Sequence, residues 1–224
     1  MRDGAEGKGD SNAVGLGARP CRDAEGVKLA SATVHEAAGR SQVVDLDLVQ
    51  VIPGSSASGP ARTVRCGQDD NLMVHAAVAE AEPGEVLVLT MPEPRPVALV
   101  GELLATQMLG RGVAAVLVDA AVRDVEELRE LGLPVWTRWV RVCGAEKTTA
   151  GTIGEPVVVG GATIRQGDLV VLDTDGAVVV ERERIDEVLA AARVREDRET
   201  EKRAKLQAGE LSYDLDGLRR LVEG

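Results

Sequence analysis

The middle of the chain alternates short apolar runs with segments of helical spacing. Four of the runs are too short for a helix and predict buried strands, at 85–90, 98–100, 113–119 and 133–136. Three segments carry apolar side chains at helical spacing, at 72–81, 102–110 and 123–131. Because strands that alternate with helices usually pair in parallel, this pattern predicts an α/β fold.

The regions on either side of this alternation have different patterns. Before it, the spacing predicts an amphipathic helix at 27–38, and segment 43–52 mixes strand and turn signals. A strand is predicted at 61–66, after the break that Gly59 and Pro60 are expected to make. After it, short β runs separated by Gly and Asp predict a β-rich layer, at 156–159, 162–165, 169–172 and 177–180.

Residues 183–208 predict a long and highly charged helix. Its first half carries an apolar stripe, formed by Ile185, Val188, Leu189 and Ala192. Farther along the same face the side chains are charged, at Glu196, Glu199 and Arg203. The first half is therefore expected to pack on its own domain. The second half either leans on a neighbouring subunit or is a solvated helix stabilised by ion pairs four residues apart.

These patterns divide the chain into three parts. Residues 1–26 are polar and rich in Gly, and predict a disordered leader. Residues 27–182 form the expected α/β domain, and 183–224 a helical extension with a last short segment at 211–222. The leader lacks the apolar stretch of a signal peptide, and no run of eighteen apolar residues occurs, so we expect a cytoplasmic protein without membrane contact.

Composition narrows the possible partners. The chain of 224 residues has no Phe, one Tyr and two Trp, so its core must be aliphatic and it lacks a stacking platform for single-stranded nucleic acid. With 26 basic and 37 acidic residues its net charge is −11, which also argues against nucleic acid as a partner. Its three scattered cysteines are more typical of small buried side chains than of a zinc site or a nucleophile.

The turn from the predicted strand 98–100 into the helix at 102–110 is a candidate anion site. The backbone N–H groups at a helix start are free, and the helix dipole favours negative charge there, so Gly101, Leu103 and Leu104 could hold a small carboxylate. The simpler alternative is that Glu102 only favours the first helical turn through its charge.

Arg123 and Asp124 follow the predicted strand 113–119, at the edge where ligands collect in open α/β sheets. Asp124 could hold Mg²⁺, which prefers few protein carboxylates and several waters. Arg123 offers a cationic fork for a carboxylate or a developing enolate oxygen. Alternatively, Asp124 caps the next helix and Arg123 pairs with Asp119 or Glu127; the dipeptide alone leaves both interpretations open.

One spaced motif resembles the signature of the class II pyruvate aldolases related to the regulator of ribonuclease E activity A, the RraA-like family. It consists of Glu102, twenty further residues, Arg123-Asp124 and then Glu127. Members of that branch cleave 4-hydroxy-4-methyl-2-oxoglutarate and 4-carboxy-4-hydroxy-2-oxoadipate. The resemblance spans roughly residues 27–222. It includes further matching segments, at 33–37, 59–61, 70–76, 101–134, 160–161, 167–168 and 195–211.

The resemblance implies a swivelling-domain-type α/β sandwich that forms homotrimers or hexamers. It also implies that Asp124 binds Mg²⁺ or Mn²⁺ and that Arg123 lies beside the substrate. The amides of Leu103 and Leu104 would hold the pyruvoyl carboxylate.

Three further side chains receive roles by the same resemblance. Glu102 falls near the waters of the metal, where these aldolases often have Asp. Lys147 falls where a family lysine faces the far end of the substrate. Glu199 falls where the neighbouring subunit donates an acid.

The activity implied is cleavage of a 4-hydroxy-2-oxo diacid to pyruvate and a second 2-oxo acid. A water oriented by Glu102 would act as base, the metal and Arg123 would stabilise the enolate, and oxaloacetate decarboxylation would be a side activity. One alternative is a repurposed lyase for another oxo acid in specialised metabolism. The other is a non-catalytic binding protein similar to the ribonuclease regulators.

The two histidines and two tryptophans are placed outside the candidate site. His35 and His75 each fall on a predicted helix, where a lone histidine more often has a structural role. Segment 136–139 follows a strand and could line the pocket, but core or interface packing is the favoured interpretation for Trp136 and Trp139.

Overall fold

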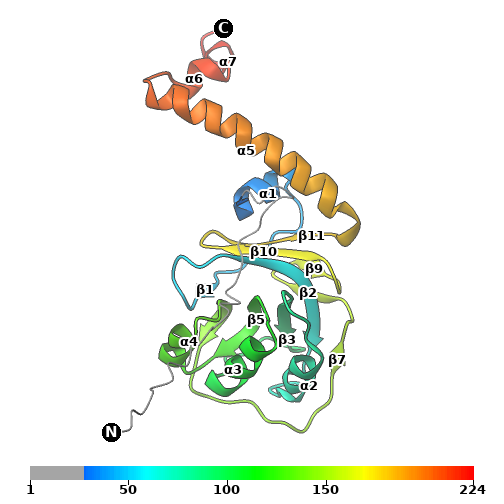
Figure 1. The fold of residues 1–224 in the computed structure, drawn as a ribbon. Helices are drawn as coiled ribbons and strands as arrows, with labels where there is room; N and C mark the ends of the chain where they lie inside the picture. The colour runs from blue at the N-terminus through cyan, green and yellow to red at the C-terminus, as the bar shows by residue number, and fades with distance from the viewer. Residues whose placement is uncertain (1–27) are drawn as a thin grey trace, which may run out of the picture.

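The computed structural model describes residues 28–224, so the predicted leader at 1–26 lies outside the described residues. Within them, a nine-stranded sheet has the central order β1-β6-β5-β3-β2-β10-β11, with β4 beside β5 and β7 beside β2 (Figure 1). Its strands are β1 (Val49–Gln50), β2 (Ala57–Arg65), β3 (Val86–Thr90), β4 (Ala98–Val100), β5 (Ala115–Val122), β6 (Val135–Val140), β7 (Thr152–Ile153), β10 (Leu169–Asp173) and β11 (Gly176–Val180). A separate hairpin consists of β8 (Val157–Val159) and β9 (Ala162–Ile164).

The centre of the sheet is parallel, as the alternation predicts. Strand β3 pairs in parallel with β2 and β5, and β5 does so with β4 and β6. Strand β4 pairs with the end of β5, at Ala121 and Val122, so the carboxyl ends of these two strands lie together. Three helices cover one face of this parallel part (Figure 1), namely α2 (Leu72–Glu80), α3 (Glu102–Gly110) and α4 (Val125–Leu131).

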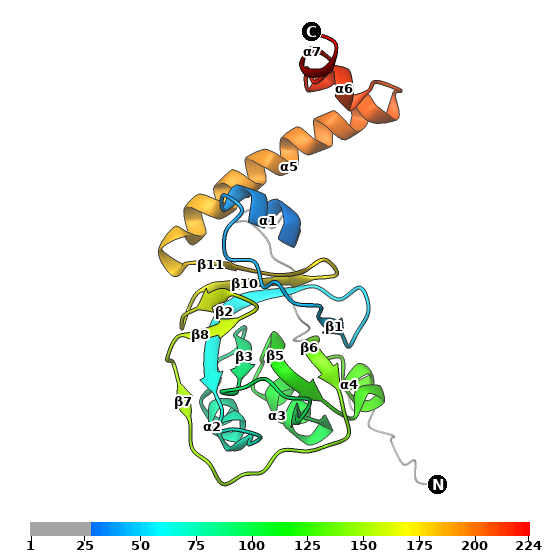
Figure 2. The ribbon, with the colours of Figure 1, turned by 180° about the vertical axis from the view of Figure 1, so that it is seen from behind.

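The C-terminal helix lies on the other side of the molecule. Short helix α1 (Ser31–Ala37) and the first half of α5 (Ile185–Gln207) pack on the outer face of β10 and β11 (Figure 2). The predicted stripe forms this contact, with Val188 and Ala192 buried and Ile185 and Leu189 packed against them. The α/β fold with a long C-terminal helix is therefore confirmed.

The rest of the C-terminal extension has little contact with the sheet. The far half of α5 extends away from it (Figures 1 and 2) and is followed by α6 (Ser212–Leu215) and α7 (Arg219–Val222). Lys202 of α5 pairs with Asp216, which ties these short helices to α5. A short turn, η1 (Arg182–Arg184), precedes α5.

None of the helices that the structure describes combines the length and the apolar character needed to cross a membrane.

Several predicted boundaries were wrong. Strand β2 begins at Ala57 and passes through Gly59 and Pro60, because the missing side chain of Gly59 lets the carbonyl of Gly84 approach, while Pro60 lies opposite Leu169 of β10. The helix predicted from 27 begins only at Ser31. Segment 43–52 does mix strand and turn, with an isolated bridge at Val43, bends and the two residues of β1. Strand β7 was not predicted.

Strand β5 is longer than predicted, and this changes the environment of Asp119. Because β5 continues to Val122, Asp119 is buried within the strand and does not reach its end. Its carboxylate lies 3.0 Å from Nη1 of Arg138, so it does not pair with Arg123. Helix α4 begins at Val125, two residues later than predicted, because residues 121–122 still belong to β5.

Candidate active site

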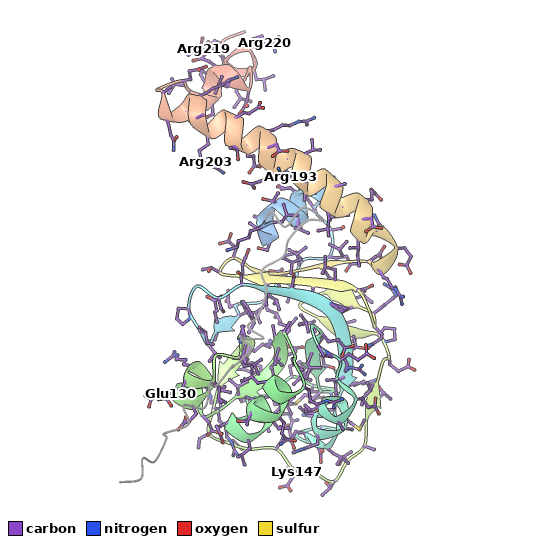
Figure 3. All side chains as sticks on the ribbon, viewed as in Figure 1. Glu130, Lys147, Arg193, Arg203, Arg219 and Arg220 are labelled. Carbon is purple, nitrogen blue, oxygen red and sulfur yellow. The ribbon has the colours of Figure 1, made fainter. Side chains whose placement is uncertain are left out.

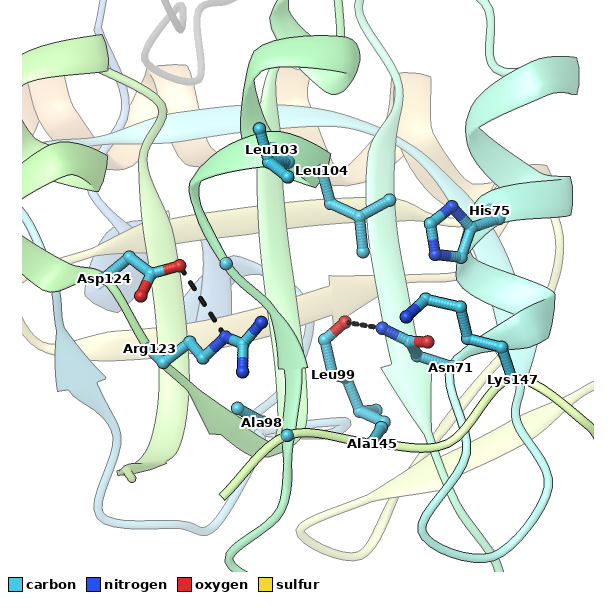
Figure 4. A pocket seen from close by; sticks show the side chains of 12 residues that line it. Asn71, His75, Ala98, Leu99, Leu103, Leu104, Arg123, Asp124, Ala145 and Lys147 are labelled. Atoms are coloured by element: carbon cyan, nitrogen blue, oxygen red, sulfur yellow. Dashed lines mark hydrogen bonds and ion pairs between the residues drawn. The ribbon is translucent and has the colours of Figure 1, made fainter. Parts of the chain in front are cut away.

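A cavity of about 160 Å³ opens where the end of β4, the end of β5, the start of α2, the start of α3 and the loop after β6 meet (Figure 4). It contains six of the eight residues expected at the site, namely Gly101, Leu103, Leu104, Arg123, Asp124 and Lys147. The other lining residues are Asn71, His75, Ala98, Leu99, Gly144 and Ala145. Glu102 faces an adjacent hollow of about 390 Å³, which it shares with Asp124.

The Arg123 side chain lies between two glycines. A Cβ atom on Gly101 would lie 3.2 Å from its Nε, and one on Gly144 would lie 2.7 Å from its Nη1. The Arg123 amide also donates to the carbonyl of Val100 at 3.0 Å, which joins the end of β5 to β4. The two glycines therefore make room for the guanidinium group, and the role of Gly144 was not predicted.

Asp124 has a left-handed backbone, with φ of 57°, which is unusual for a residue other than Gly. Its Oδ2 accepts a hydrogen bond from the amide of Glu102 at 3.1 Å and lies 3.7 Å from Nε of Arg123. The carboxylate makes no cap hydrogen bond to α4, so it satisfies the start of α3 and not of its own helix. The simple capping and pairing alternatives for Asp124 and Arg123 are therefore wrong.

The start of α3 presents free donors to the cavity. The amide of Ala105 bonds to the carbonyl of Gly101, whereas the amides of Leu103 and Leu104 have no partner within residues 28–224. The Leu104 side chain is buried and that of Leu103 is 76% exposed. With the positive end of the helix dipole and Arg123 beside them, these two amides suit a small carboxylate.

The side chains near Asp124 fit a magnesium ion that keeps most of its waters. No group of three or more His, Cys, Asp or Glu side chains that could hold a metal occurs in the described part of the chain. Mg²⁺, however, is commonly held by one or two carboxylates plus waters. The Asp124 side chain is 41% exposed, and the adjacent hollow has room for waters beside Glu102.

Asp70 positions the loop that carries Lys147. Its carboxylate accepts hydrogen bonds from the amides of Thr148 at 2.6 Å, Thr149 at 2.9 Å and Leu72 at 2.8 Å. Burial by itself raises the pKa of the Asp70 carboxyl, but the hydrogen bonds from these amides outweigh it and hold the pKa below its usual range. The ionised carboxylate thus joins the start of α2 to the loop that carries Lys147.

Replacing Asp70 with Asn is expected to lower the free energy of unfolding at pH 7 by about 2–3 kcal/mol, because bonds to an ionised acceptor are lost. A carboxyl whose pKa is lowered in the folded state stabilises above its unfolded pKa of about 4, and this stabilisation disappears as the pH falls through the folded value. The difference from wild type should therefore shrink below about pH 4 in urea titrations. The exposed Asp175→Asn serves as control, and an Asp70→Asn deficit independent of pH would contradict the prediction.

Two lining residues were not predicted at the site. Asn71 and His75 come from the start of α2 and lie on the side of the cavity opposite Arg123 and Asp124, next to Lys147 (Figure 4). His75 was expected to be structural, and its place in the cavity is a correction. Burial lowers the pKa of His75, and the nearby charge of Lys147 lowers it further, so the imidazole is neutral at pH 7. A signal existed in the sequence, since residues 70–76 belong to the segments that resemble the family.

The remaining singled-out residues lie elsewhere. Trp136 is buried in the core, so the packing interpretation is confirmed for it. Trp139 is only partly buried and lies against the guanidinium of Arg138, away from the cavity. His35 belongs to α1, on the other side of the sheet. Cys21 lies outside the described residues.

The two described cysteines differ. Cys66 is buried, as expected; burial and the charge of Asp70 raise the pKa of its thiol to about 12, which keeps it unreactive. Cys143 is exposed, contrary to the expectation of a buried side chain.

Glu199 does not reach the cavity of its own chain. It lies on α5 and pairs with Arg195 at 2.8 Å. Figure 3 shows Arg193 and Arg203 of the same helix at the opposite end of the molecule from Lys147. A role for Glu199 at the site would therefore require a second copy of the chain.

Comparisons with known proteins agree with this fold. The family model described as RraA-like, Aldolase/RraA, matches residues 24–179. A protein from Halalkalibacterium halodurans, provisionally named 4-hydroxy-4-methyl-2-oxoglutarate aldolase, is 36% identical over 147 residues, which are 65% of this chain and 70% of that protein.

Two solved structures place regulators among the similar proteins. RraAS2 from Streptomyces coelicolor, described as an unusual member of the RNase ES inhibitor RraA protein family, has a TM-score of 0.70 and 30% identity, covering 78% of this chain and 91% of that one. The RNA-processing inhibitor RraA from Thermus thermophilis has a TM-score of 0.64 and 25% identity, covering 69% and 93%. The family match over most of the chain shows that this protein belongs to the RraA-like aldolase family.

Proposed function

We propose that the protein is a carbon–carbon lyase that cleaves a 4-hydroxy-2-oxo diacid to pyruvate and a second 2-oxo acid. The observation that carries this proposal is the convergence of the Arg123 guanidinium, the Asp124 carboxylate and the free amides of Leu103 and Leu104 on one cavity. The name of the relative from Halalkalibacterium halodurans supports the same class of reaction.

The substrate would bind through its two ends. The amides of Leu103 and Leu104 hold the carboxylate next to the 2-oxo group, and Lys147 across the cavity faces the second carboxylate (Figure 4). Concentrating positive charge at these points lets a chain with a net charge of −11 bind an anionic substrate.

Cleavage begins when the C4 hydroxyl loses its proton, through a water in the adjacent hollow, to the Glu102 carboxylate that orients this water. The C3–C4 bond then breaks, its electron pair forms the pyruvate enolate, and the hydroxyl-bearing carbon becomes the carbonyl of the second product. A Mg²⁺ or Mn²⁺ ion held by Asp124 would supply the Lewis acidity that draws electrons toward the C2 oxygen. Arg123 stabilises the enolate oxygen, and proton return to C3 gives pyruvate.

The role proposed for Glu199 requires an oligomer, because this residue does not reach the cavity of its own chain. In a homotrimer, or a hexamer of two trimers, α5 of one subunit would bring Glu199 to the cavity of the next. The apolar stripe that packs on the sheet ends at Ala192, while Val194 and Leu206 farther along α5 are exposed, and apolar side chains left uncovered in this way support a partner of this kind.

We expect pyruvate release from 4-hydroxy-4-methyl-2-oxoglutarate, and from oxaloacetate by decarboxylation through the same enolate. The assay couples pyruvate to lactate dehydrogenase and is run with Mg²⁺, with Mn²⁺ and with a chelator. Activity that depends on the divalent metal supports the proposal. Release that is equally fast with chelator, or no release from any 4-hydroxy-2-oxo diacid or oxaloacetate, would overturn it.

A second candidate function is binding of a protein partner without catalysis. The likeness to RraAS2 favours it, because 91% of that chain is covered at 30% identity. The pyruvate assay separates the two candidates, since a pure binding protein releases no pyruvate under any metal condition.

A further inference from the structure

Two buried polar atoms in the cavity wall lack a hydrogen-bond partner among the described residues. They are Oδ1 of Asn71 and Nε2 of His75. Both side chains line the cavity, and they lie one helical turn apart at the start of α2, where the amide of His75 points to the carbonyl of Asn71. Buried polar atoms are nearly always paired, so two unpaired atoms on cavity-lining side chains one helical turn apart indicate a missing ligand group.

The orientation of the Asn71 amide is set by the protein. Its Nδ2 donates to the carbonyl of Leu99 at 2.9 Å, which leaves Oδ1 as the free atom (Figure 4). The side chain is 7% exposed, so bulk water does not satisfy this oxygen. The cavity therefore presents a fixed acceptor that requires a hydrogen-bond donor from the ligand.

His75 complements this acceptor. Its neutral imidazole carries one N–H, and the tautomer with the proton on Nε2 makes the unpaired atom a donor. Lys147 faces the same side of the cavity, and Arg123 and Asp124 lie across from it (Figure 4). One acceptor and one donor thus lie beside Lys147, at the end of the cavity away from Arg123 and Asp124.

We propose that Asn71 and His75 form a hydroxyl-binding subsite for the substrate. A hydroxyl group donates one hydrogen bond and accepts others, so in the bound substrate it donates to Oδ1 of Asn71 while its oxygen accepts from Nε2–H of His75. When the hydroxyl turns its proton to the water that Glu102 orients, the bond from His75 stays on the oxygen that becomes negative. The group bound is the C4 hydroxyl, at which cleavage begins. This inference rests on the proposed function, and it makes Asn71 and His75 the residues that distinguish a 4-hydroxy-2-oxo acid from an oxo acid without the hydroxyl.

The test compares two substrates on the same variants. Oxaloacetate lacks a C4 hydroxyl, and its decarboxylation needs only the enolate machinery. In Asn71→Leu and His75→Leu, kcat/KM for 4-hydroxy-4-methyl-2-oxoglutarate is expected to fall by about 10–100-fold, because a buried group loses its partner. Oxaloacetate decarboxylation should change by less than about 3-fold, as expected for a contact that this substrate does not make. His75→Gln, which keeps a donor near the same place, should recover part of the loss.

The outcomes separate the subsite from the proposed function. Equal losses on both substrates would show that Asn71 only anchors α2 to β4 through Leu99. Unchanged activity on both would show that a water fills the space between the two atoms. Either result overturns the subsite while the proposed function stands. If Asn71→Leu does not fold, His75→Leu and His75→Gln decide alone, and wild-type inactivity on both substrates overturns the proposed function and the subsite with it.

Discussion

Replacing Arg123 with alanine is expected to lower kcat for pyruvate release by about 10²–10³-fold, the usual cost of removing one donor that stabilises developing negative charge. The guanidinium is held between Gly101 and Gly144, so its position is set before the substrate arrives. Since the enolate oxygen gains charge only as the C3–C4 bond breaks, the loss should appear in kcat more than in KM. Steady-state kinetics with saturating Mg²⁺ measures both.

Two further arginine variants sharpen this prediction. Arg123→Lys keeps the charge but loses the planar fork, and it should recover only part of the activity. Arg141→Ala removes an exposed side chain just after β6 whose one hydrogen bond within residues 28–224 goes to the carbonyl of Val140, and it should leave kcat unchanged. If Arg123→Ala turns over almost as fast as wild type while Asp124→Ala is inactive, the role assigned to Arg123 is wrong.

The fold was predictable where local pattern decides it. Strand β4 and helix α3 have the predicted boundaries, at Ala98–Val100 and Glu102–Gly110, because Gly101 separates a fully buried run from a segment of helical spacing. The apolar stripe of α5 likewise predicted which half of that helix packs on the sheet. In these elements the signal lies in neighbouring residues.

Boundaries set by tertiary contacts were not predictable in this way. Strand β2 passes through Gly59 and Pro60, two residues that usually end strands, because Gly84 and β10 approach the chain there. Strand β5 continues beyond Asp119, since Arg138 on β6 compensates a carboxylate that would otherwise end a buried run. Each exception depends on a residue distant in sequence.

The residues of the candidate site also differ in whether local sequence pattern or tertiary contacts reveal them. Glu102, Arg123 and Asp124 were found because two adjacent strand-to-helix turns carry them. Asn71 and His75 were not predicted at the site from the sequence, because a single histidine on a helix has no distinguishing pattern until α2 is placed beside β4. The capping role of Asp124 for α3 was also hidden, since it depends on a left-handed backbone at a residue other than Gly.

Replacing Asp124 with Asn is expected to reduce metal-dependent pyruvate release by at least about 10³-fold, because the neutral amide is a far weaker ligand for a hard cation and several kcal/mol of charge stabilisation disappear. Asn tolerates the left-handed backbone, and its oxygen can still accept the hydrogen bond from the amide of Glu102. The fold and the start of α3 should therefore be retained. Thermal unfolding with and without Mg²⁺ checks this, since a bound ion raises the Tm of the wild type and should not raise that of Asp124→Asn.

The matched control is Glu130→Gln, which removes a carboxylate from the hollow that Asp124 also lines (Figure 3). Because Mg²⁺ is held by few carboxylates, loss of this more distant charge should alter the Mg²⁺ response by less than about 3-fold. If both variants weaken the Mg²⁺ response to the same degree, the ion responds to the summed acidity of α3 and α4 and Asp124 is not its ligand. If Asp124→Asn keeps full activity with Mg²⁺, the metal site assigned to Asp124 is wrong.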